Sequence, residues 1–315
     1  MSVKVQDVRN VTVIGAGLMG HGIAQVFAQS GYKVNLRDIK AAFLANAMSR
    51  MKDNLTKLST AGLVPKGEIE TILARVITTL DLKEAVAETD FVIEAATEDI
   101  DLKKQIFKEV DELSPPNTIL ATNTSGLPIV EVAQSTNRPT KVIGTHFWNP
   151  PYLLRAVEIV KGPETSDETI ALTHDLLTKV GKKPVVVNKD IPGQIGIRIL
   201  YAMIREAISL VEKGVATPKD IDTVVKEALG TRLPVLGALE LADLSGVDLV
   251  LMVAKRLFKD LENTAMPSKL LEEMVAEGRN GIKTSKGFYD WTPDSIDSII
   301  RKRDEHLLST LKESA

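Results

Sequence analysis

A histidine and a glutamate stand twelve residues apart, each beside or within a run whose composition favours extended structure. His146 follows the predicted strand 141–145, and Glu158 lies on the next extended run, beyond a turn that contains Asn149-Pro150-Pro151. A hairpin-like return would bring the carboxylate onto the imidazole, which would give a general acid/base and the group that orients it. The alternative is a structural histidine with satisfied hydrogen bonds and a surface glutamate, and spacing alone does not decide.

A glycine-rich segment near the N-terminus has the spacing of a phosphate-binding loop. Its residues are Gly15, Gly17, Leu18, Met19 and Gly20. They connect an apolar run, 11–15, to a segment with helical spacing, 17–29. The first glycine permits a tight turn, the second lets the backbone approach a pyrophosphate, and the third lets helix and strand pack closely. A glycine turn that binds another ligand is the alternative.

The nature of the expected dinucleotide depends on the end of the second predicted strand, residues 32–37. Asp38 stands there, eighteen positions after Gly20, where an acidic residue holds the ribose hydroxyls of NAD. Arg37 leaves NADP open, because an arginine can accept a 2′-phosphate, but the neighbouring carboxylate opposes that phosphate. The sequence therefore favours NAD. We interpret His21, in the first turn of the helix, as incidental.

The elements that must position these residues alternate in the first half of the chain between short β-rich runs and helical patterns. This alternation predicts a doubly wound parallel sheet of the Rossmann type, an α/β fold with helices on both faces. The expected strands are 11–15, 32–37, 91–95, 118–121 and 141–145, and the expected helices include 17–29, 41–58 and 99–113. Open α/β sheets bind ligands beyond the carboxyl ends of their strands, which is where His146 would lie.

Beyond residue 188 the pattern changes to helices with almost no strand signal. The expected helices are 195–213, 218–229, 238–261 and 268–277. We therefore predict two domains, residues 1–188 for NAD binding and an all-α domain, residues 189–315. A last helix is expected to begin at Thr292-Pro293 and to dock its apolar face on the body or on a partner subunit.

Composition excludes several classes of protein. The 315 residues include no cysteine, which excludes a disulfide framework, thiolate metal sites, iron–sulfur clusters and a catalytic thiol; no metal site is predicted. A net charge of −3 gives no attraction to nucleic acid or anionic membrane. The longest apolar stretches, such as 249–254, fall short of the roughly 20 residues of a membrane span. We expect a cytoplasmic protein whose partner is a small molecule.

Six separated motifs occur along the chain. They are the glycine loop with its helix start, 15–24, Ile93-Glu94-Ala95, Asn123-Thr124-Ser125, His146-Phe147-Trp148-Asn149-Pro150, Val157-Glu158-Ile159 and Lys286-Gly287-Phe288-Tyr289. In this order they resemble the motifs of the L-3-hydroxyacyl-CoA dehydrogenase family, which includes the bacterial 3-hydroxybutyryl-CoA dehydrogenases. The resemblance extends from about Val11 to Tyr289, nearly the whole chain.

The resemblance implies an NAD-binding domain, a helical C-terminal domain that forms a homodimer, and a role in fatty acid metabolism. It implies that His146 is the acid/base, with Glu158 as its orienting partner, and that Ser125 and Asn149 contact substrate and nicotinamide. Further cofactor contacts are implied for Asp38, Glu98, Lys103, Ser125, Asn149 and Lys283. From the residues alone, Ser125 could be a helix N-cap, and the Glu98 and Lys103 pair could be an exposed helix start.

Three segments depart from the family pattern, all on the substrate side. Where the family has Pro-Gly-Phe-x-x-Asn-Arg, Gln194 replaces the phenylalanine and Ile197 replaces the asparagine. The turn that is lysine-rich in the family and meets the CoA phosphates is 59–63, which contains no lysine, and the family's Met-Lys pair is Leu154-Arg155. The Ile197 exchange removes both a donor and an acceptor, which costs about 1–3 kcal/mol if a substrate oxygen there is buried.

Together these features predict an NAD-dependent dehydrogenase that interconverts a short-chain (3S)-3-hydroxyacyl-CoA and the 3-ketoacyl-CoA. Oxidation of the secondary alcohol requires loss of the hydroxyl proton as hydride leaves the carbon, and His146 would take that proton. The first alternative is a non-CoA β-hydroxy acid, as in the related gulonate, carnitine and pyridine-carboxylate dehydrogenases. The second is a non-catalytic NAD-binding structural protein.

Overall fold

The structure, a computed structural model, describes residues 4–313, and its internal contacts divide the chain into two compact units. The N-terminal unit comprises Met1–Ile197 and Arg303–Ala315, and the helical unit comprises Arg198–Lys302. This division differs from the predicted domain bounds 1–188 and 189–315 in two respects. It lies after Ile197, and it returns the last residues of the chain to the N-terminal unit.

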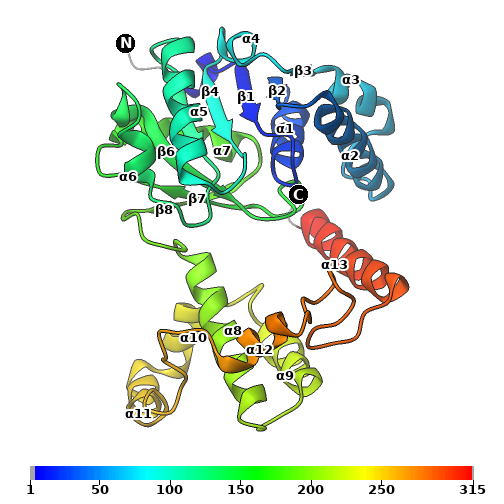
Figure 1. The fold of residues 1–315 in the computed structure, drawn as a ribbon, viewed down its shortest axis with the longest axis vertical. Coiled ribbons are helices and arrows are strands. Elements are labelled where there is room, and N and C mark those ends of the chain that lie inside the picture. Colours follow the sequence, from blue (N-terminus) through cyan, green and yellow to red (C-terminus); the bar gives the residue numbers. More distant parts are fainter. Residues whose placement is uncertain (1–3, 314–315) are drawn as a thin grey trace. The chain divides into compact units, whose positions relative to one another are not determined.

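Eight strands form one sheet in the N-terminal unit, in the order β3-β2-β1-β4-β5-β6-β7-β8 (Figure 1). The strands are β1 (Asn10–Ile14), β2 (Lys33–Arg37), β3 (Val76–Thr79), β4 (Phe91–Glu94), β5 (Ile119–Thr122), β6 (Val142–Phe147), β7 (Ala156–Val160) and β8 (Lys183–Val187). Neighbours are parallel from β3 to β6, β6 pairs antiparallel with β7, and β7 pairs parallel with β8. The strand order reverses direction between β1 and β4, the switch point at which such sheets bind ligands. The expected Rossmann-type sheet is confirmed.

Hydrophobic cores lie on both faces of this sheet. Phe91 and Ile93 of β4 belong to one cluster and Val92 to the other, because successive strand side chains point to opposite faces. The helices of this unit are α1 (Gly20–Gln29), α2 (Ala41–Thr60), α3 (Ile69–Ala74), α4 (Leu82–Val86), α5 (Ile100–Leu113), α6 (Ile129–Ala133) and α7 (Asp167–Lys179). Helices α1, α2, α3 and α7 contribute to the first cluster and α4, α5 and α6 to the second, which explains why the central strands are continuous apolar runs.

Two strands were absent from the sequence-based prediction, and both are edge strands. Strand β3 has two exposed residues in its middle, and β8 alternates exposed and half-buried positions. An edge strand is covered less than a central one, so it lacks the uninterrupted apolar run by which the central strands were recognised. Short 3-10 segments complete this unit at Val5–Asp7, Lys66–Glu68 and Pro139–Lys141.

The helical unit contains no strand among its described residues and confirms the predicted all-α character of this region. Its helices are α8 (Gly196–Glu212), α9 (Pro218–Val224), a π-helical segment (Val225–Gly230), α10 (Ala238–Ser245), α11 (Val247–Leu257), α12 (Lys269–Ala276) and the first half of α13 (Pro293–Glu313). The expected single helix 238–261 is wrong: it is interrupted at Gly246, whose φ of 91° is left-handed. A residue in that conformation ends one helix and starts another, and glycine adopts it without steric strain.

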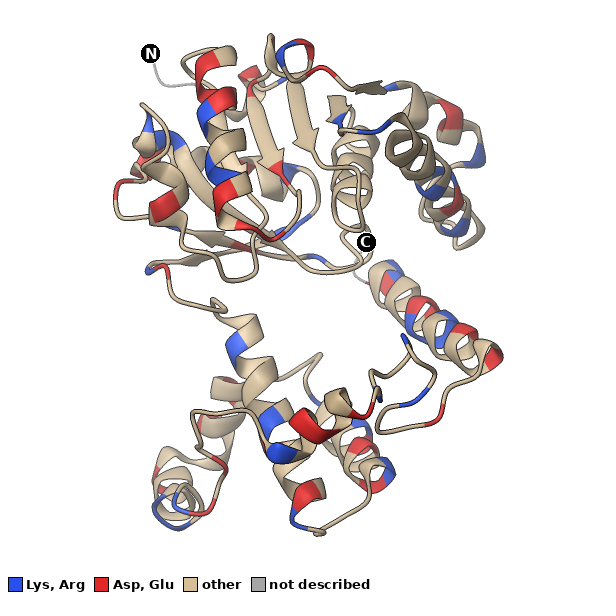
Figure 2. Ribbon diagram, in the orientation of Figure 1, with Lys and Arg blue, Asp and Glu red and all other residues tan. Residues whose placement is uncertain are grey.

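The second half of α13 packs on the N-terminal unit, as expected for a docking terminal helix. Leu307, Leu308 and Leu311 contact the core cluster that α1 and α2 share. Asp304 is buried, and one of its carboxylate oxygens lies 3.6 Å from Lys57 Nζ near the end of α2. Basic and acidic positions follow one another along the rest of α13 (Figure 2). Within residues 4–313, no helix has the length and apolar composition to cross a membrane.

Candidate active site

The antiparallel pairing of β6 and β7 brings His146 and Glu158 together. The two residues are direct partners in the register, and Nδ1 of His146 lies 2.7 Å from Oε2 of Glu158. Both side chains are about 95% buried. The hairpin-like return expected from the sequence is therefore what the structure contains, and the turn between the strands carries Asn149.

The second carboxylate oxygen of Glu158 is held by the start of α8. Its Oε1 accepts hydrogen bonds from the backbone N–H groups of Ile195, at 2.8 Å, and Gly196, at 3.0 Å. Burial opposes ionisation, but the hydrogen bonds from His146 and from these two amides outweigh it and lower the pKa of Glu158. An ionised Glu158 accepts the Nδ1–H of the imidazole, which leaves the lone pair of a neutral His146 on Nε2.

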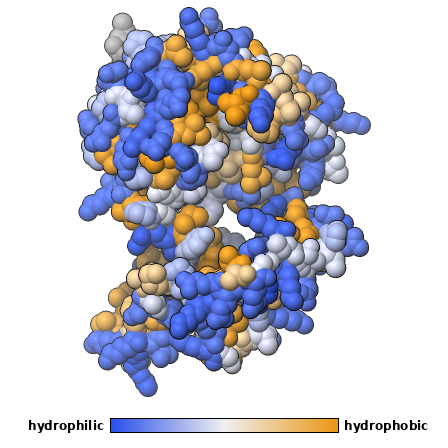
Figure 3. All heavy atoms as spheres, viewed as in Figure 1, coloured by the Kyte–Doolittle hydropathy of each residue, from blue (hydrophilic) through white to orange (hydrophobic). Residues whose placement is uncertain are grey.

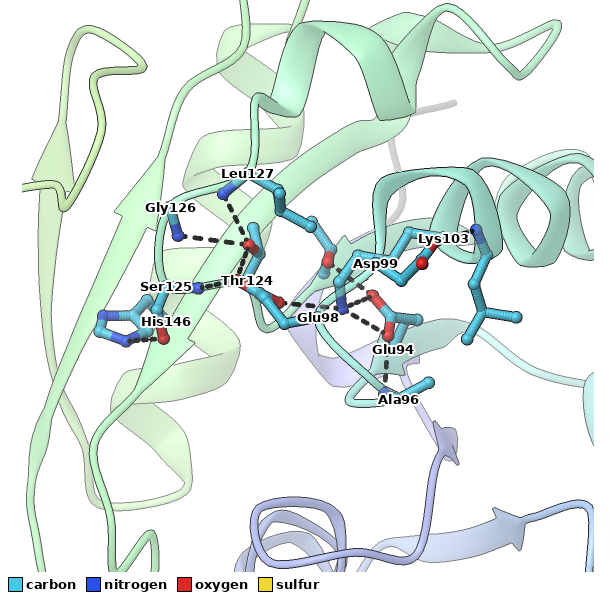
Figure 4. Close-up of polar contacts among 12 residues, drawn as sticks. Glu94, Ala96, Glu98, Asp99, Lys103, Thr124, Ser125, Gly126, Leu127 and His146 are labelled. Carbon is cyan, nitrogen blue, oxygen red and sulfur yellow. Dashed lines mark hydrogen bonds and ion pairs between the residues drawn. The ribbon is translucent and has the colours of Figure 1, made fainter. Parts of the chain in front are cut away.

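Ser125 completes a chain of polar groups at Nε2. Its hydroxyl oxygen lies 3.2 Å from Nε2 of His146 (Figure 4). The backbone N–H of Ser125 and the hydroxyl of Thr124 both donate to Oε1 of Glu98, at 2.9 and 2.6 Å. Glu98 therefore fixes the loop after β5 that presents the serine hydroxyl to the histidine. A substrate oxygen bound beside these two atoms would meet a hydroxyl and a proton acceptor at once.

A buried ion pair lies next to Glu98 and supports this loop. Lys103 Nζ lies 2.7 and 2.8 Å from the two carboxylate oxygens of Glu94, and both side chains have no exposed surface (Figure 4). The same ammonium lies 3.5 Å from Glu98 Oε2, and the hydroxyl of Thr122 also donates to Glu94. The implied cofactor contact of Lys103 stays a prediction that this burial disfavours. The geometry instead indicates that Lys103 holds Glu98 in place by its charge, and the Glu98 side chain is 45% exposed.

Each of the three glycines of the loop meets a requirement of a pyrophosphate-binding turn. Gly15 has a φ of 99°, and a Cβ there would lie 2.6 Å from the carbonyl oxygen of Ala95. A Cβ on Gly20 would lie 1.7 Å from the carbonyl oxygen of Gly15, so helix α1 and β1 can pack only if that residue is glycine. A Cβ on Gly17 would meet nothing within 4 Å, which leaves open space above the backbone where a phosphate can approach.

A hollow of about 550 Å³ adjoins this loop at the carboxyl ends of β1, β2 and β4. Asp38 lines it, with Arg37 and Arg50 nearby, as a ribose-binding carboxylate would. Asp38 Oδ2 also accepts the backbone N–H of Ala16 at 2.6 Å, so the carboxylate fastens the loop as well. Of the other loop residues, Leu18 is 61% exposed, and Met19 packs on the core.

The turn that carries Asn149 is pinned from two sides. Asn149 is exposed and precedes a cis peptide bond to Pro150. The buried ammonium of Lys182 donates to the carbonyl oxygens of Pro151 and, at 2.9 Å, Leu154. Desolvation by burial, together with the charge of Arg155, lowers the pKa of Lys182 to about 8. The ring of Pro151 packs against Gly22 of α1, where a Cβ would lie 3.0 Å from Cδ of the proline, so the turn rests on the helix that follows the glycine loop.

The remaining predicted residues have different surroundings. Gln194 is 1% exposed, whereas Ile197 is half-buried. Lys283 lies exposed in the helical unit, outside the unit that holds the histidine and glutamate. His21, read as incidental, is buried, with Nδ1 2.8 Å from the carbonyl oxygen of Gly17, and burial lowers its pKa.

Sequence reasoning did not identify Trp148, Gly196 and Lys182 as residues of this site. The indole of Trp148 is 5.3 Å from the imidazole of His146, centroid to centroid, and a Cβ on Gly196 would lie 2.2 Å from Cζ2 of that indole. Lys182 has no local signal at all, since a lysine before a strand is ordinarily a surface residue. Trp148 lies inside a recognised motif, and that position was the available signal.

Two family models match the sequence and together cover most of it. One, described as "3-hydroxyacyl-CoA dehydrogenase, NAD binding domain", matches residues 10–191, and the other, the C-terminal domain of the same family, matches residues 193–291. A 3-hydroxybutyryl-CoA dehydrogenase of Clostridioides difficile is 42% identical over 284 residues, which are 89% of this chain and 99% of that protein.

Two further likenesses extend over more of the chain. A 5-formyl-3-hydroxy-2-methylpyridine 4-carboxylate 5-dehydrogenase of Mesorhizobium japonicum is 34% identical over 303 residues, 96% of this chain and 97% of that protein. A crystal structure of a dehydrogenase of the same name, described as an NAD+-dependent dismutase, has a TM-score of 0.90 at 34% identity, covering 97% of this chain and 98% of that one. The relative with the higher identity is named for a CoA thioester, whereas the relative that matches more of the chain is named for a pyridine carboxylate.

Proposed function

Because the chain belongs to the 3-hydroxyacyl-CoA dehydrogenase family and has its NAD-binding domain, we propose that it interconverts the hydroxyl and the carbonyl of a small polar acid with His146 as general acid/base. It is an NAD-dependent oxidoreductase of this family's type. The observation that carries the proposed site is the position of His146 Nε2, which faces the Ser125 hydroxyl while Glu158 holds the opposite nitrogen.

The proton chemistry follows from these contacts. NAD, when bound, accepts the hydride in oxidation and its reduced form returns it in reduction. Nε2 of His146 takes the proton of the substrate hydroxyl, and the Ser125 hydroxyl donates a hydrogen bond to the same substrate oxygen. The imidazolium that forms is stabilised by the ionised Glu158 at 2.7 Å, which keeps the ring in one orientation throughout. In reduction the proton returns from Nε2 to the carbonyl oxygen.

Cofactor binding is assigned to groups that suit a dinucleotide. The open space above Gly17 and the N-terminal amides of α1 suit the pyrophosphate, and Asp38 suits the ribose hydroxyls. Glu98, through Ser125 and Thr124, keeps the serine where both nicotinamide and substrate would meet it. Asn149 and Lys283 stay predicted cofactor contacts.

The end of α2 supports a small acid in preference to a CoA thioester. The segment 59–63, which ends α2 and forms the turn after it, has no lysine to meet CoA phosphates, and Asp304 of α13 lies 3.6 Å from Lys57 in the last turn of α2. Helix α13 lies beyond residue 291, where the family model ends, whereas the pyridine-carboxylate relative matches nearly the whole chain. An acidic side chain paired with the nearby lysine also reduces the positive charge available to a phosphate.

The second candidate is a short-chain (3S)-3-hydroxyacyl-CoA, which the sequence alone ranked first. It is supported by the 42% identity with a 3-hydroxybutyryl-CoA dehydrogenase and by the same His146 and Glu158 motifs. The His–Glu chemistry is identical for both substrates. The two candidates differ only in what holds the part of the substrate remote from the reacting carbon.

One comparison of rates separates the candidates. NADH oxidation is followed with acetoacetyl-CoA, with free acetoacetate and with 5-formyl-3-hydroxy-2-methylpyridine 4-carboxylate, each of which offers a carbonyl for NADH to reduce. The proposal expects turnover of one of the free acids at least equal to that of the thioester. A preference for the thioester of about a hundredfold, worth about 2.7 kcal/mol of transition-state binding, would instead establish the CoA substrate.

We also propose that the chain is a homodimer that associates through the helical unit. Large apolar side chains of α10 and α11 are exposed in the single chain, several of them by more than half, and Figure 3 shows hydrophobic residues among the hydrophilic surface of this unit. A monomer rarely exposes so much apolar surface on adjoining elements. A role in fatty acid metabolism and a cytoplasmic location stay predictions.

A further inference from the structure

Gln194 is a buried amide whose two polar ends both lack a partner. Its side chain is 1% exposed, and neither Oε1 nor Nε2 has a hydrogen-bond partner within residues 4–313. Tyr32 and Thr145 each leave one hydroxyl in the same condition, but each hydroxyl is a single group. A buried amide without partners costs folding free energy, so its presence indicates a bound water or ligand that satisfies it.

The backbone at Gln194 is strained as well. Its φ of 44° is left-handed, and it follows Gly193, which has a φ of 78°. Left-handed backbone outside glycine concentrates at functional sites, where the surrounding structure imposes it. Here the consequence is visible in the next two residues, because Ile195 and Gly196 both direct their N–H groups at the same oxygen of Glu158.

Gln194 adjoins the proposed site through its neighbours in the chain. The next two residues, Ile195 and Gly196, supply the amides that hold Glu158, and Gly196 also contacts the indole that lies beside His146. A methionine of similar length would fill the same space without unpaired groups, so packing alone gives no reason for an amide here.

We propose that Gln194 is a substrate-selecting residue whose amide hydrogen-bonds a polar group of the substrate. The Nε2 donors match a carboxylate, and the Oε1 acceptor matches a second hydroxyl or a protonated ring nitrogen. A small hydroxy acid or heteroaromatic acid offers such groups, whereas the alkyl chain of an acyl thioester offers neither. Because the amide is 1% exposed, its contact with substrate requires the turn 192–196 to move. This inference rests on the proposed small-acid function and identifies what would recognise that acid.

The test compares Gln194→Met with Gln194→Asn and with the exposed control Gln134→Met, all as full-length chains. The probes are free (S)-3-hydroxybutyrate and its methyl ester, each with NAD. We expect Gln194→Met to raise the KM for the acid about tenfold or more, because a hydrogen bond to a charged group is lost. The KM for the ester and for NAD should stay within twofold of the wild type. Gln194→Asn keeps an amide and tolerates a positive φ, so it should raise the KM less.

Other outcomes would overturn the inference. An unchanged KM for the acid together with a higher midpoint of thermal unfolding would mean that the amide is only a buried polar group. A raised KM for NAD with an unchanged KM for the acid would move the contact to the cofactor. NADH binding followed by fluorescence establishes that each variant is folded.

Failure of the small-acid function has a separate signature. If the wild type turns over only the thioester, the proposed small-acid function is wrong, and Gln194 is then judged by the KM for the thioester. A tenfold rise in Gln194→Met would retain its selecting role with a different substrate. An unchanged value would overturn that role as well.

Discussion

At the scale of single residues, the site depends on the two oxygens of one carboxylate having different tasks. Oε2 of Glu158 accepts from the His146 ring, and Oε1 accepts two backbone amides from the start of α8. A carboxylate can accept on both sides at once, whereas an amide has an acceptor on one side and a donor on the other. Glutamine is therefore a conservative replacement in shape and a disruptive one in hydrogen bonding.

Glu158→Gln should lower kcat about a hundredfold to ten-thousandfold. In either orientation its NH₂ group faces a donor, and the imidazolium formed during turnover loses its counter-charge. The measurement is steady-state NADH formation with the best substrate, with Glu164→Gln, an exposed change of the same chemistry, as control. A kcat within threefold of the wild type would contradict the assignment of Glu158 as the orienting group.

The same carboxylate makes stability depend on pH in acid. The pKa of Glu158 in the folded chain lies below its ordinary value of 4.5, which applies in the unfolded chain. Its contribution to the free energy of unfolding is therefore fully present above pH 4.5 and is lost as the pH falls through the lower folded pKa. Urea unfolding of wild type and Glu158→Gln should differ most at neutral pH and converge in acid. Curves that run parallel across this range would contradict the pKa direction.

The chemical roles of His146 and Glu158 could be predicted from the sequence, but the groups that hold the site residues in place could not. The residue types and the twelve-residue spacing of His146 and Glu158 indicated an acid/base pair before any fold was known. The amides of Ile195 and Gly196 lie 37 and 38 residues from Glu158, and backbone donors carry no residue-type signal. Nor does any local pattern reveal that Lys103 is wholly buried, since that follows from its ion pair with Glu94.

At the scale of elements, the first turn of α8 is constrained by close packing as well as by hydrogen bonds. Gly196→Ala should reduce kcat about tenfold and the free energy of unfolding by about 1–3 kcal/mol, because its Cβ would lie 2.2 Å from the Trp148 indole. Either the indole or the turn must move, and one borders His146 while the other holds Glu158. The matched control is Gly67→Ala, where a Cβ meets nothing within 4 Å. Equal effects of the two substitutions would contradict this account.

Strands that are buried on both faces were predicted from the sequence, whereas the partly covered edge strands were not. The central strands were recognised because they are covered on both faces, as at β4, where all four residues are buried. Strands β3 and β8 are half-covered edges, and the break at Gly246 falls within an apolar pattern that continues on both sides of it. Periodicity reports which residues are covered, but a single glycine that redirects a helix leaves the periodicity almost unchanged.

Helix α13 should contribute measurably to the stability of the N-terminal unit. Replacing Leu307, Leu308 and Leu311 together by alanine should lower the free energy of unfolding by about 3 kcal/mol, since each side chain is half-buried on the core. Chemical denaturation measures the change, with the exposed substitution Lys302→Ala as control. A loss below about 0.5 kcal/mol, the range of ordinary surface changes, would mean that the helix does not dock in solution.

At the scale of the whole molecule, the helical unit has almost no core of its own. Among its described residues, Ile208, Ser209 and Met274 are those that are more than nine-tenths buried. Its large apolar side chains are instead exposed, as in Leu239 at 83%, Leu244 at 72% and Leu251 at 55%. A region of this size ordinarily needs far more buried apolar area to balance its conformational entropy. A second copy of the chain would supply that burial if the exposed helices α10 and α11 met their counterparts.

Association and folding of this unit should therefore be coupled. We expect sedimentation equilibrium to give a dimer at micromolar concentration, and the midpoint of thermal unfolding to rise with protein concentration, as mass action requires when the native state is the dimer. Leu251→Lys places a charge on the exposed apolar surface of α11 and should both release monomer and lower that midpoint, whereas Asn263→Lys, an exposed polar position in the same unit, should do neither. A wild-type monomer with a concentration-independent midpoint would contradict the coupling. It would require the helical unit to be stable with its apolar helices in water, against the free energy of about 25 cal/mol per Å² that favours their burial.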